Sequence, residues 1–454
     1  MTPNPGFQPV YPVWQRYLER AGASSPVPLK IAVEREDGLV SVFEAAAPSQ
    51  DADPEGTYRI VERVVKFLLW SRGGWRIHVQ GPAAIGRRLK ADYAETGARA
   101  FDTRTMGGVY ERPFEVALHS PATFPEAREA VHFPGGNLKG FRIGFDLGAS
   151  DYKVAAVIDG EPVWSEEIPW APGEQADPEY HYRMIQEGLK KAASHLPRVD
   201  AIGGSSAGIL IRRQVRIASL FRSVPPGLFE TKVKGLFDRL AQEWGVPFEV
   251  INDGEVTALA GRLSLGETGV LGVAMGSSEA AGFLDNDGHI PGGLDELAFA
   301  PVDLNPDAVA DEWSRDRGVG ANYFSQQAVN RLALSAGLKF PDGMKLPERL
   351  KEVQSLVASG NVEASHVFEQ IGAYLGSTIP WYEVFYRFKN LLVLGRVMSG
   401  PGGKIIVDKA AEVLSSQFPA TAARVRLHLL DEKSRRVGQA VAAASLPEIP
   451  GEDL

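Results

Sequence analysis

A motif that recurs 128 residues apart most constrains how this chain can fold. GFDLGASD begins at Gly144, and GVAMGSSE begins at Gly272 with glycine, serine and acidic residues at matching places. Each copy is an apolar run, a turn of small residues and a second apolar run, which predicts a strand–turn–strand hairpin. A run of shared turn residues in two such contexts predicts two related lobes, each of which opens with a β-hairpin.

The segments around the hairpins alternate between strand-like and helix-like patterns. FRIGFDL, KVAAVID and EPVWSEEI are short strand patterns, and helix patterns alternating with further strands follow them. This alternation is typical of a mixed α/β sheet. We therefore expect an α/β chain with an additional N-terminal α/β domain at residues 1–138, a first lobe at 139–262 and a second lobe at 263–429. In the N-terminal domain, RIVERVVKFLLW predicts a core helix in preference to an interface helix.

Composition excludes several classes of protein. The 454 residues carry a formal net charge of −9, and residues 1–138 contain 16 basic and 16 acidic residues. A nucleic-acid or anionic-membrane binder would normally carry a basic patch, so we expect neither partner. The chain has no cysteine, which excludes disulfides, thiolate metal sites and a cysteine nucleophile. Because we find no signal-like segment and no apolar run of membrane length, we expect a cytoplasmic protein.

The turn of the first hairpin carries residues suited to phosphate and magnesium. Backbone N–H groups at Gly148 can approach phosphate oxygens closely, and Ser150 adds a hydroxyl donor. Asp146 lies on the strand face opposite Phe145, where a carboxylate can hold Mg²⁺ or its waters. The alternative is a plain hairpin in which Asp146 only solvates an exposed face. The repeat favours phosphate binding.

VINDGEVTALAGR, at residues 250–262, predicts a junction between a strand and a helix. Asn252 and Asp253 then lie at the carboxyl end of a strand, where open α/β sheets bind ligands. Asp253 is a candidate general base that takes a proton from a substrate hydroxyl during phosphoryl transfer. The alternative is an N-cap turn that satisfies the helix donors.

Two glycine-rich stretches are weaker candidates for binding sites. GHIPGGLDELAFAP, at residues 288–301, contains Asp295 and Glu296, either of which can bind a hydroxyl group. Its alternative interpretation is a solvated surface loop. In NLLVLGRVMSGPGG, a buried strand breaks at Gly395, which suits the close approach of a flat ligand such as adenine. Glycine is equally an ordinary way to end a strand.

The order of these motifs resembles that of ROK (repressor, open reading frame, kinase) sugar kinases, in the superfamily of actin, sugar kinases and heat-shock ATPases. IGFDLGAS and GVAMGSSEAAGFLDNDGHIPGG resemble the two phosphate motifs, and VINDGEVTALAG resembles the Asn–Asp motif. LLVLGRVMSG is similar to the adenosine motif, and residues 430–446 are similar to the closing helix that returns to the first lobe. The resemblance covers residues 140–446. It implies two actin-like, ribonuclease H-like lobes with a cleft between them.

The resemblance also implies ATP and Mg²⁺ as cofactors and assigns roles by position. Asp253 is the implied general base, and Asn252 and Glu296 are the implied ligands of sugar hydroxyls. Asp146 is implied to reach Mg²⁺ through water. The residues implied to lie at the nucleotide are Asp146, Gly148, Ser150, Gly276, Ser277, Ser278 and Gly395.

Several positions depart from the family pattern. The Gly-Thr-Gly turn of the family reads Gly-Ser-Ser at 276–278, and the motif histidine is Phe299. Residues 317–333 lack the zinc cysteines, with Val319 at one such position, and Ala321 stands where a later sugar-binding Glu is found. These changes exclude a Cys/His zinc site of the family type. They indicate an unusual sugar or polyol substrate, or an impaired kinase.

We predict an ATP-dependent carbohydrate kinase that phosphorylates a hydroxyl group of a sugar or sugar-like polyol, and we expect a homodimer. The alternative is a non-catalytic sugar-binding sensor or regulator on the same fold, which predicts a helix-turn-helix within residues 1–138. The neutral charge of that segment and its strand-like WRIHVQGP disfavour this alternative. A nucleotide-gated scaffold that uses residues 1–138 to bind a partner also stays open.

Overall fold

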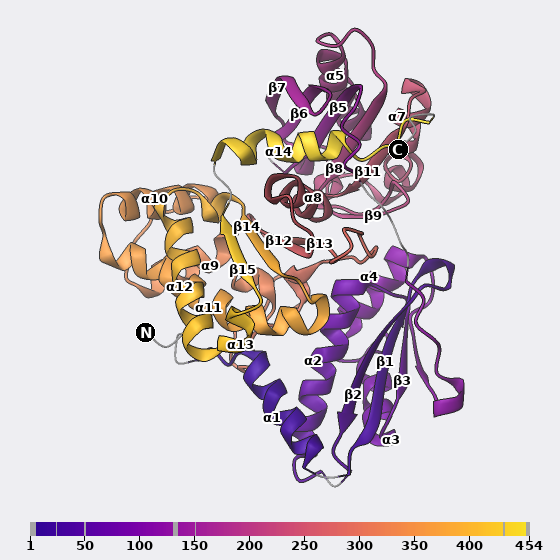
Figure 1. Ribbon diagram of the computed structural model, residues 1–454, viewed down its shortest axis with the longest axis vertical. Coiled ribbons are helices and arrows are strands. Elements are labelled where there is room, and N and C mark those ends of the chain that lie inside the picture. Colours follow the sequence, from indigo (N-terminus) through magenta and orange to yellow (C-terminus); the bar gives the residue numbers. More distant parts are fainter. Residues whose placement is uncertain are drawn as a thin grey trace. The chain divides into compact units, whose positions relative to one another are not determined.

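The chain forms two compact units in the computed structural model (Figure 1). The structure describes residues 6–23, 25–49, 51–129, 135–149, 151–429 and 432–450. The first unit comprises Met1–Val131, Ala274–Ala280 and Pro291–Leu429, and the second comprises His132–Val273, Ala281–Ile290 and Leu430–Leu454. The predicted domain boundaries at residues 138, 262 and 429 stay predictions.

The N-terminal part of the first unit is built on a four-stranded sheet in the order β2-β1-β3-β4. The strands are β1 (Val27–Glu34), β2 (Val40–Ala47), β3 (Arg76–Gln80) and β4 (Glu115–Leu118). β1 pairs antiparallel with both β2 and β3, whereas β4 is parallel to β3. Parallel strands need a crossover connection, which α3 (Ala83–Asp92) and α4 (Ala100–Tyr110) supply here.

Helix α2 (Pro54–Arg72) is the central helix of this part and lies against β1 and β2 (Figure 1). The Asp53 side chain caps its N-terminus by accepting from the N–H of Gly56 at 2.9 Å, and Pro54 fits the first helical position. Gly73 ends the helix with φ at 80°. Side chains on every face of α2 are buried, which confirms the predicted core helix. Helix α1 (Val10–Gly22) packs against α2.

The second unit contains a five-stranded sheet in the order β11-β8-β5-β6-β7. β5, β8 and β11 are parallel, and β5, β6 and β7 form an antiparallel meander. Ile143, Phe145 and Leu147 point from β5 into a core with helices α5 and α7. The bounds are β5 (Phe141–Leu147), β6 (Asp151–Ile158), β7 (Glu161–Pro169), β8 (Ala201–Ser206), β11 (Phe248–Asn252), α5 (Pro178–Ala193) and α7 (Leu236–Trp244). The connection from β8 to α7 holds β9 (Ile209–Ile211), β10 (Gln214–Ile217) and the short helix α6 (Pro226–Leu228).

A second sheet repeats the same order with four strands, β13-β12-β14-β15. The hairpin β12 (Val270–Met275) and β13 (Glu279–Leu284) corresponds to β5 and β6. The parallel strands β14 (Asn390–Leu394) and β15 (Arg426–Leu429) correspond to β8 and β11. This correspondence confirms the repeat predicted from the two turn motifs. The helices after the second hairpin are α9 (Gln326–Ser335), α10 (Leu346–Ala358), α11 (Val362–Tyr386), α12 (Pro401–Gln417) and α13 (Pro419–Ala422).

The C-terminal helix α14 (Glu432–Ala444) packs within the second unit against β5, β8 and helix α8 (Asp253–Leu265). Two strand glycines make this contact close. A Cβ atom added at Gly144 would lie 1.7 Å from the carbonyl oxygen of Ala440, and one at Gly203 would lie 1.7 Å from that of Ala443. Buried Arg142 donates to the carbonyl of Pro447 at 2.8 Å. The face of β5 that carries Gly144 is therefore covered by helix backbone.

Within the described part of the chain, no helix has the length and hydrophobicity needed to cross a lipid bilayer.

Gly144→Ala should destabilise the second unit by about 3 kcal/mol, because the added methyl group overlaps the backbone of α14 and forces the helix outward. Urea denaturation measures the free energy of unfolding. Gly438→Ala is the matched control: it lies in α14 itself, its added Cβ would meet no atom within 4 Å, and alanine there should be neutral or stabilising by about 0.5–1 kcal/mol. Equal stability of Gly144→Ala and the wild type would contradict the close contact.

Candidate functional site

Asp146 lies near the end of β5 and is held by both neighbouring strands. It pairs with Lys153 on β6 and with Ser205 on β8. The Ser205 hydroxyl donates to one carboxylate oxygen at 2.5 Å, and the Lys153 ammonium lies 3.4 Å from the other. The side chain is only 9% exposed, so the interpretation of Asp146 as a solvated surface carboxylate is wrong.

The turn after β5 is fixed by a buried tryptophan. The indole N–H of Trp170 donates to the carbonyl of Gly148 at 2.8 Å. Ser150, the predicted hydroxyl donor, lies outside the described residues. A cavity of about 190 Å³ adjoins the turn and is lined by Ala149, Trp170, Ala171, Gly173, Glu174, Leu220 and Arg222.

Asn252 ends β11 and caps helix α8, which confirms the N-cap interpretation of the Asn–Asp motif. Its side-chain oxygen accepts from the N–H of Gly254 at 2.7 Å, and Glu255 accepts from the backbone N–H of Asn252 at 3.3 Å. The side-chain amide also donates to the carbonyl of Gly208 at 2.8 Å. These bonds fix the orientation of Asn252. The amide group can still offer an acceptor lone pair and a hydrogen to a ligand.

Asp253 is the first residue of α8 and lies close enough to Asp146 for the two charges to interact. Burial and, after it, the negative charge of Asp146 together raise the pKa of Asp253 to about 6, whereas backbone hydrogen bonds and Lys153 oppose the shift. The two carboxylates therefore lie near each other, and Lys153 compensates only part of their negative charge. Oxygen ligands of this kind fit Mg²⁺, which would relieve their repulsion. These residues therefore fit the cation that the sequence predicts.

The second hairpin turn lies in the first unit, next to Gly395. Ser277 and Ser278 are exposed, and the N–H of Gly276 donates to the carbonyl of Ser278 at 2.9 Å. Gly395 has φ at 97°, and a Cβ atom there would lie 2.5 Å from the carbonyl oxygen of Met275. Glycine is required at 395 because the end of β14 meets the backbone of β12 directly.

Glu279, directly after this turn, is a buried carboxyl group that the sequence analysis missed. Its exposed fraction is 3%, and burial raises its pKa to about 8. The Tyr382 hydroxyl bonds one carboxyl oxygen at 3.0 Å, and the other oxygen has no hydrogen-bond partner among the described residues. A Cβ atom at Gly320 would lie 2.0 Å from that second oxygen. The sequence pattern did not predict this burial, because an acidic residue beside a turn carries no indication that it is buried.

The loop at residues 288–301 is not a solvated surface loop. Asp295 is 2% exposed and accepts from the Tyr386 hydroxyl at 2.8 Å. Glu296 is partly buried, and its backbone N–H donates to the carbonyl of Trp70 in α2 at 3.0 Å. The candidate hydroxyl ligand is therefore carried by a loop that is bonded to the N-terminal part of the first unit.

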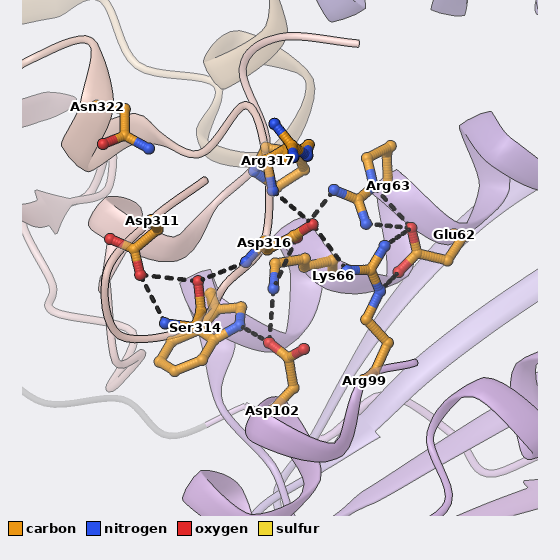
Figure 2. A network of polar contacts seen from close by, with 12 residues as sticks. Glu62, Arg63, Lys66, Arg99, Asp102, Asp311, Ser314, Asp316, Arg317 and Asn322 are labelled. Atoms are coloured by element: carbon orange, nitrogen blue, oxygen red, sulfur yellow. Dashed lines mark hydrogen bonds and ion pairs between the residues drawn. The ribbon is translucent and has the colours of Figure 1, made fainter. Parts of the chain in front are cut away.

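A buried group of charges, here called the α2 ion cluster, joins α2 to the segment after this loop (Figure 2). The Lys66 ammonium lies 2.7 Å from Asp102 and 3.1 Å from Asp316. The positive charges of Arg63 and Lys66 hold the pKa of Asp316 far below its usual range, although burial acts against them. The only sequence signal was charged residues within an apolar helix pattern. The cluster comprises Glu62, Arg63, Lys66, Arg99, Asp102 and Asp316.

One group of side chains among the described residues has the spacing of a metal site, namely Asp285, Asp287 and His289. Asp285 accepts from the backbone N–H groups of Asp287 and His289 at 2.9 and 2.8 Å. The turn itself therefore accounts for the orientation of Asp285.

The structure brings Asp146 and Asp253 together in the second unit, and Gly276 and Gly395 together in the first. Phe299 and Val319 stand where the resemblance described above implies a histidine and a zinc cysteine. Phe299 packs against Trp70 with ring centroids 4.4 Å apart, and Val319 is fully buried. Both positions are filled by apolar packing.

Comparison with solved structures identifies the architecture. A ROK-family glucokinase from Streptomyces griseus, solved with glucose and AMPPNP, matches with a TM-score of 0.54 and 18% identity over 68% of this chain and 99% of its own. A ROK-family transcriptional regulator homologous to the E. coli MLC protein has the same TM-score and identity over 68% of this chain and 79% of its own. The ROK hexokinase from Thermus thermophilus matches with a TM-score of 0.50 and 18% identity over 67% of this chain and 98% of its own.

The chain has the fold of the ROK family. The predicted α/β class with two actin-like lobes is thereby confirmed. No family model matches the sequence, and no curated protein matches it. Because kinases and a transcriptional regulator share the ROK fold, the fold alone does not decide the activity.

Glu279→Gln should make the stability of the protein less sensitive to pH. The folded carboxyl keeps its proton up to a pKa of about 8, whereas the unfolded one ionises near 4.5, so wild-type stability falls as pH rises between these values. Glutamine cannot ionise, so the variant should exceed the wild type by about 3 kcal/mol at pH 8 and match it near pH 5.

Chemical denaturation at pH 5, 6, 7 and 8 measures this difference. Glu312→Gln, at an exposed position of the same unit, is the control and should follow the wild type. Parallel pH profiles for the wild type and Glu279→Gln would show that Glu279 is ionised in the folded protein.

Proposed function

We propose that this protein is a Mg-ATP-dependent kinase that phosphorylates a hydroxyl group of a sugar or sugar-like polyol. The observation that carries the proposal is that Asp253 is buried at the start of α8, within electrostatic reach of Asp146; burial and, after it, the charge of Asp146 raise the pKa of Asp253 to about 6. A carboxylate with this pKa is mostly ionised at neutral pH and is more basic than an ordinary aspartate. Perturbed carboxylates of this kind are concentrated at functional sites.

Each candidate residue has a defined task in this proposal. Asp253 accepts the proton of the substrate hydroxyl as that oxygen attacks the phosphoryl group. Asn252 and Glu296 bind neighbouring hydroxyls and orient the acceptor, and Asp146 holds the cation through water. Bound Mg-ATP supplies the phosphoryl group and neutralises its charge. The residues proposed to hold the nucleotide are Gly148, Ser150, Gly276, Ser277, Ser278 and Gly395.

The regulator is the second candidate, because a ROK transcriptional regulator shares the fold as closely as the glucokinase does. The alternative of a sugar-binding sensor or regulator predicts a helix-turn-helix within residues 1–138. In the described N-terminal residues, α3 and α4 instead form the crossover between the parallel strands β3 and β4. This topology supports the kinase over the DNA-binding alternative. From the sequence we also propose that the protein is cytoplasmic and forms a homodimer.

Asp253→Asn should lower turnover by about 10²–10⁴-fold, because asparagine cannot accept the substrate proton. Release of ADP is measured over a panel of sugars and polyols with Mg-ATP. Asp238→Asn, at a partly exposed position of the same unit, is the control and should retain activity. Equal turnover by Asp253→Asn, or no turnover by the wild type on a broad panel, would falsify the kinase proposal. Sugar binding without ATP binding would favour the sensor.

The pH dependence of kcat/KM should also reflect the ionisation of Asp253. The base works only when deprotonated, so kcat/KM should fall as the pH drops through about 6 and level off above it. Asp146→Asn removes the neighbouring negative charge and should shift this limb to lower pH. If kcat/KM falls at the same pH in Asp146→Asn as in the wild type, the two carboxylates do not interact.

A further inference from the structure

We propose that helix α2 is a structural part of the substrate site, in which Trp70 positions the loop at residues 291–299 that carries Glu296. The inference rests on the proposed function for the role of that loop as a hydroxyl ligand. It assigns a task to the N-terminal part of the first unit, for which the sequence offered none. Trp70 acts through the loop and is therefore a positioning residue.

The end of α2 has carbonyl groups that its own helix cannot satisfy. The last turn of any α-helix leaves carbonyls without intrahelical partners. In α2 two of these carbonyls accept from the loop: Ser71 accepts from the N–H of Asp295 and Trp70 from the N–H of Glu296, both at 3.0 Å. The backbone of the candidate ligand is thus bonded directly to the helix end.

The loop must approach the helix closely for these bonds to form. A Cβ atom at Gly293 would lie 2.5 Å from the carbonyl oxygen of Ser71, and one at Gly73 would lie 2.7 Å from the side chain of Leu294. Glycine at both positions removes these collisions. Gly293 is thus explained by the contact of the loop with α2.

The Trp70 side chain holds the far end of the same loop. Its ring packs on Phe299 with centroids 4.4 Å apart, and Phe101 packs on Phe299 from α4 at 5.5 Å. The Trp70 indole N–H donates to Asp102, which also binds Lys66. Because Trp70 is completely buried, these contacts leave its ring little freedom. The orientation of Phe299 is therefore linked to the α2 ion cluster.

The beginning of the loop has a second anchor in Arg35, at the end of β1. Its guanidinium donates to the carbonyls of Pro291 and Gly292 and to the Ser41 hydroxyl, and it also pairs with Glu129. The side chain is 1% exposed. The loop is thus held at its start by Arg35, in its middle by two backbone bonds to α2, and at its end by Trp70. Glu296 itself donates one of the two middle bonds and precedes the contact of Phe299 with Trp70.

Trp70→Leu removes the ring contact with Phe299 and the bond to Asp102. We expect the KM for the sugar to rise about 10- to 100-fold through misplacement of Glu296, with the KM for ATP unchanged. The matched control is Trp14→Leu, which removes another buried tryptophan of the same unit, one that packs on Tyr17, Phe43 and Trp381. It should lose stability and keep the wild-type KM for the sugar.

Hydrogen exchange of the peptide spanning residues 291–299 provides a readout that does not depend on turnover. Exchange should be accelerated in Trp70→Leu at temperatures where the protein is folded, and unchanged in Trp14→Leu. If Trp70→Leu does not fold, Phe299→Leu and Trp70→Phe test the same contact. A double mutant of Trp70→Phe and Phe299→Leu should show non-additive effects on exchange.

The two proposals fail in different ways. Faster exchange of the loop together with absence of turnover in the wild type would remove the kinase and leave the positioning by α2. Normal exchange of the loop in every folded Trp70 and Phe299 variant would overturn the positioning, whatever the activity. A rise in the KM for the sugar that is equal in Trp14→Leu would also overturn it, because the effect would then report only stability.

Discussion

Lys66 is buried without measurable exposure in the middle of α2, and the first unit is organised around keeping it paired. Burial alone would lower the pKa of Lys66, but the carboxylates of Asp102 and Asp316 raise it above its usual value. Leaving a buried charge without its partner typically costs about 3–5 kcal/mol. Helix α4, which carries Asp102, and the segment that carries Asp316 are therefore bound to α2 by the same ammonium group. This requirement joins three segments that lie far apart in the sequence within the first unit.

The two buried groups of carboxylates differ in how well they are compensated. In the α2 ion cluster the carboxylates meet positive charges directly, and the pKa of Asp316 is held far below its usual range. At the start of α8, Asp253 faces Asp146, and burial together with that neighbouring charge raises its pKa to about 6. Paired charges of the first kind stabilise an arrangement of helices. Incompletely paired charges of the second kind favour a proton or a cation, which is why we place the chemistry at Asp253.

The sequence was most informative where the chain repeats itself. The two Gly/Ser turns predicted two related sheets, and the alternation along β5 correctly placed Phe145 in the core and Gly144 on the opposite face. The burial of Asp295 and of α2's charges could not be predicted, because each depends on a partner far along the chain. Asp295 is covered by Tyr386, and Lys66 meets Asp316; neither pair has a local signature. Local patterns therefore predict elements and turns, whereas long-range pairing of charges requires the structure.

The departures from the family pattern are explained by the same long-range contacts. A loop can be held by metal–ligand bonds or by packing and hydrogen bonds, and the requirement in either case is a fixed backbone. Phe299 stands where the resemblance places a histidine, and its ring packs against both Trp70 and Phe101. Val319 stands at a cysteine position and is fully buried. Because α2 supplies backbone acceptors, an aromatic contact and buried charges to this region, the loss of cysteine and histidine need not leave the loop unsupported.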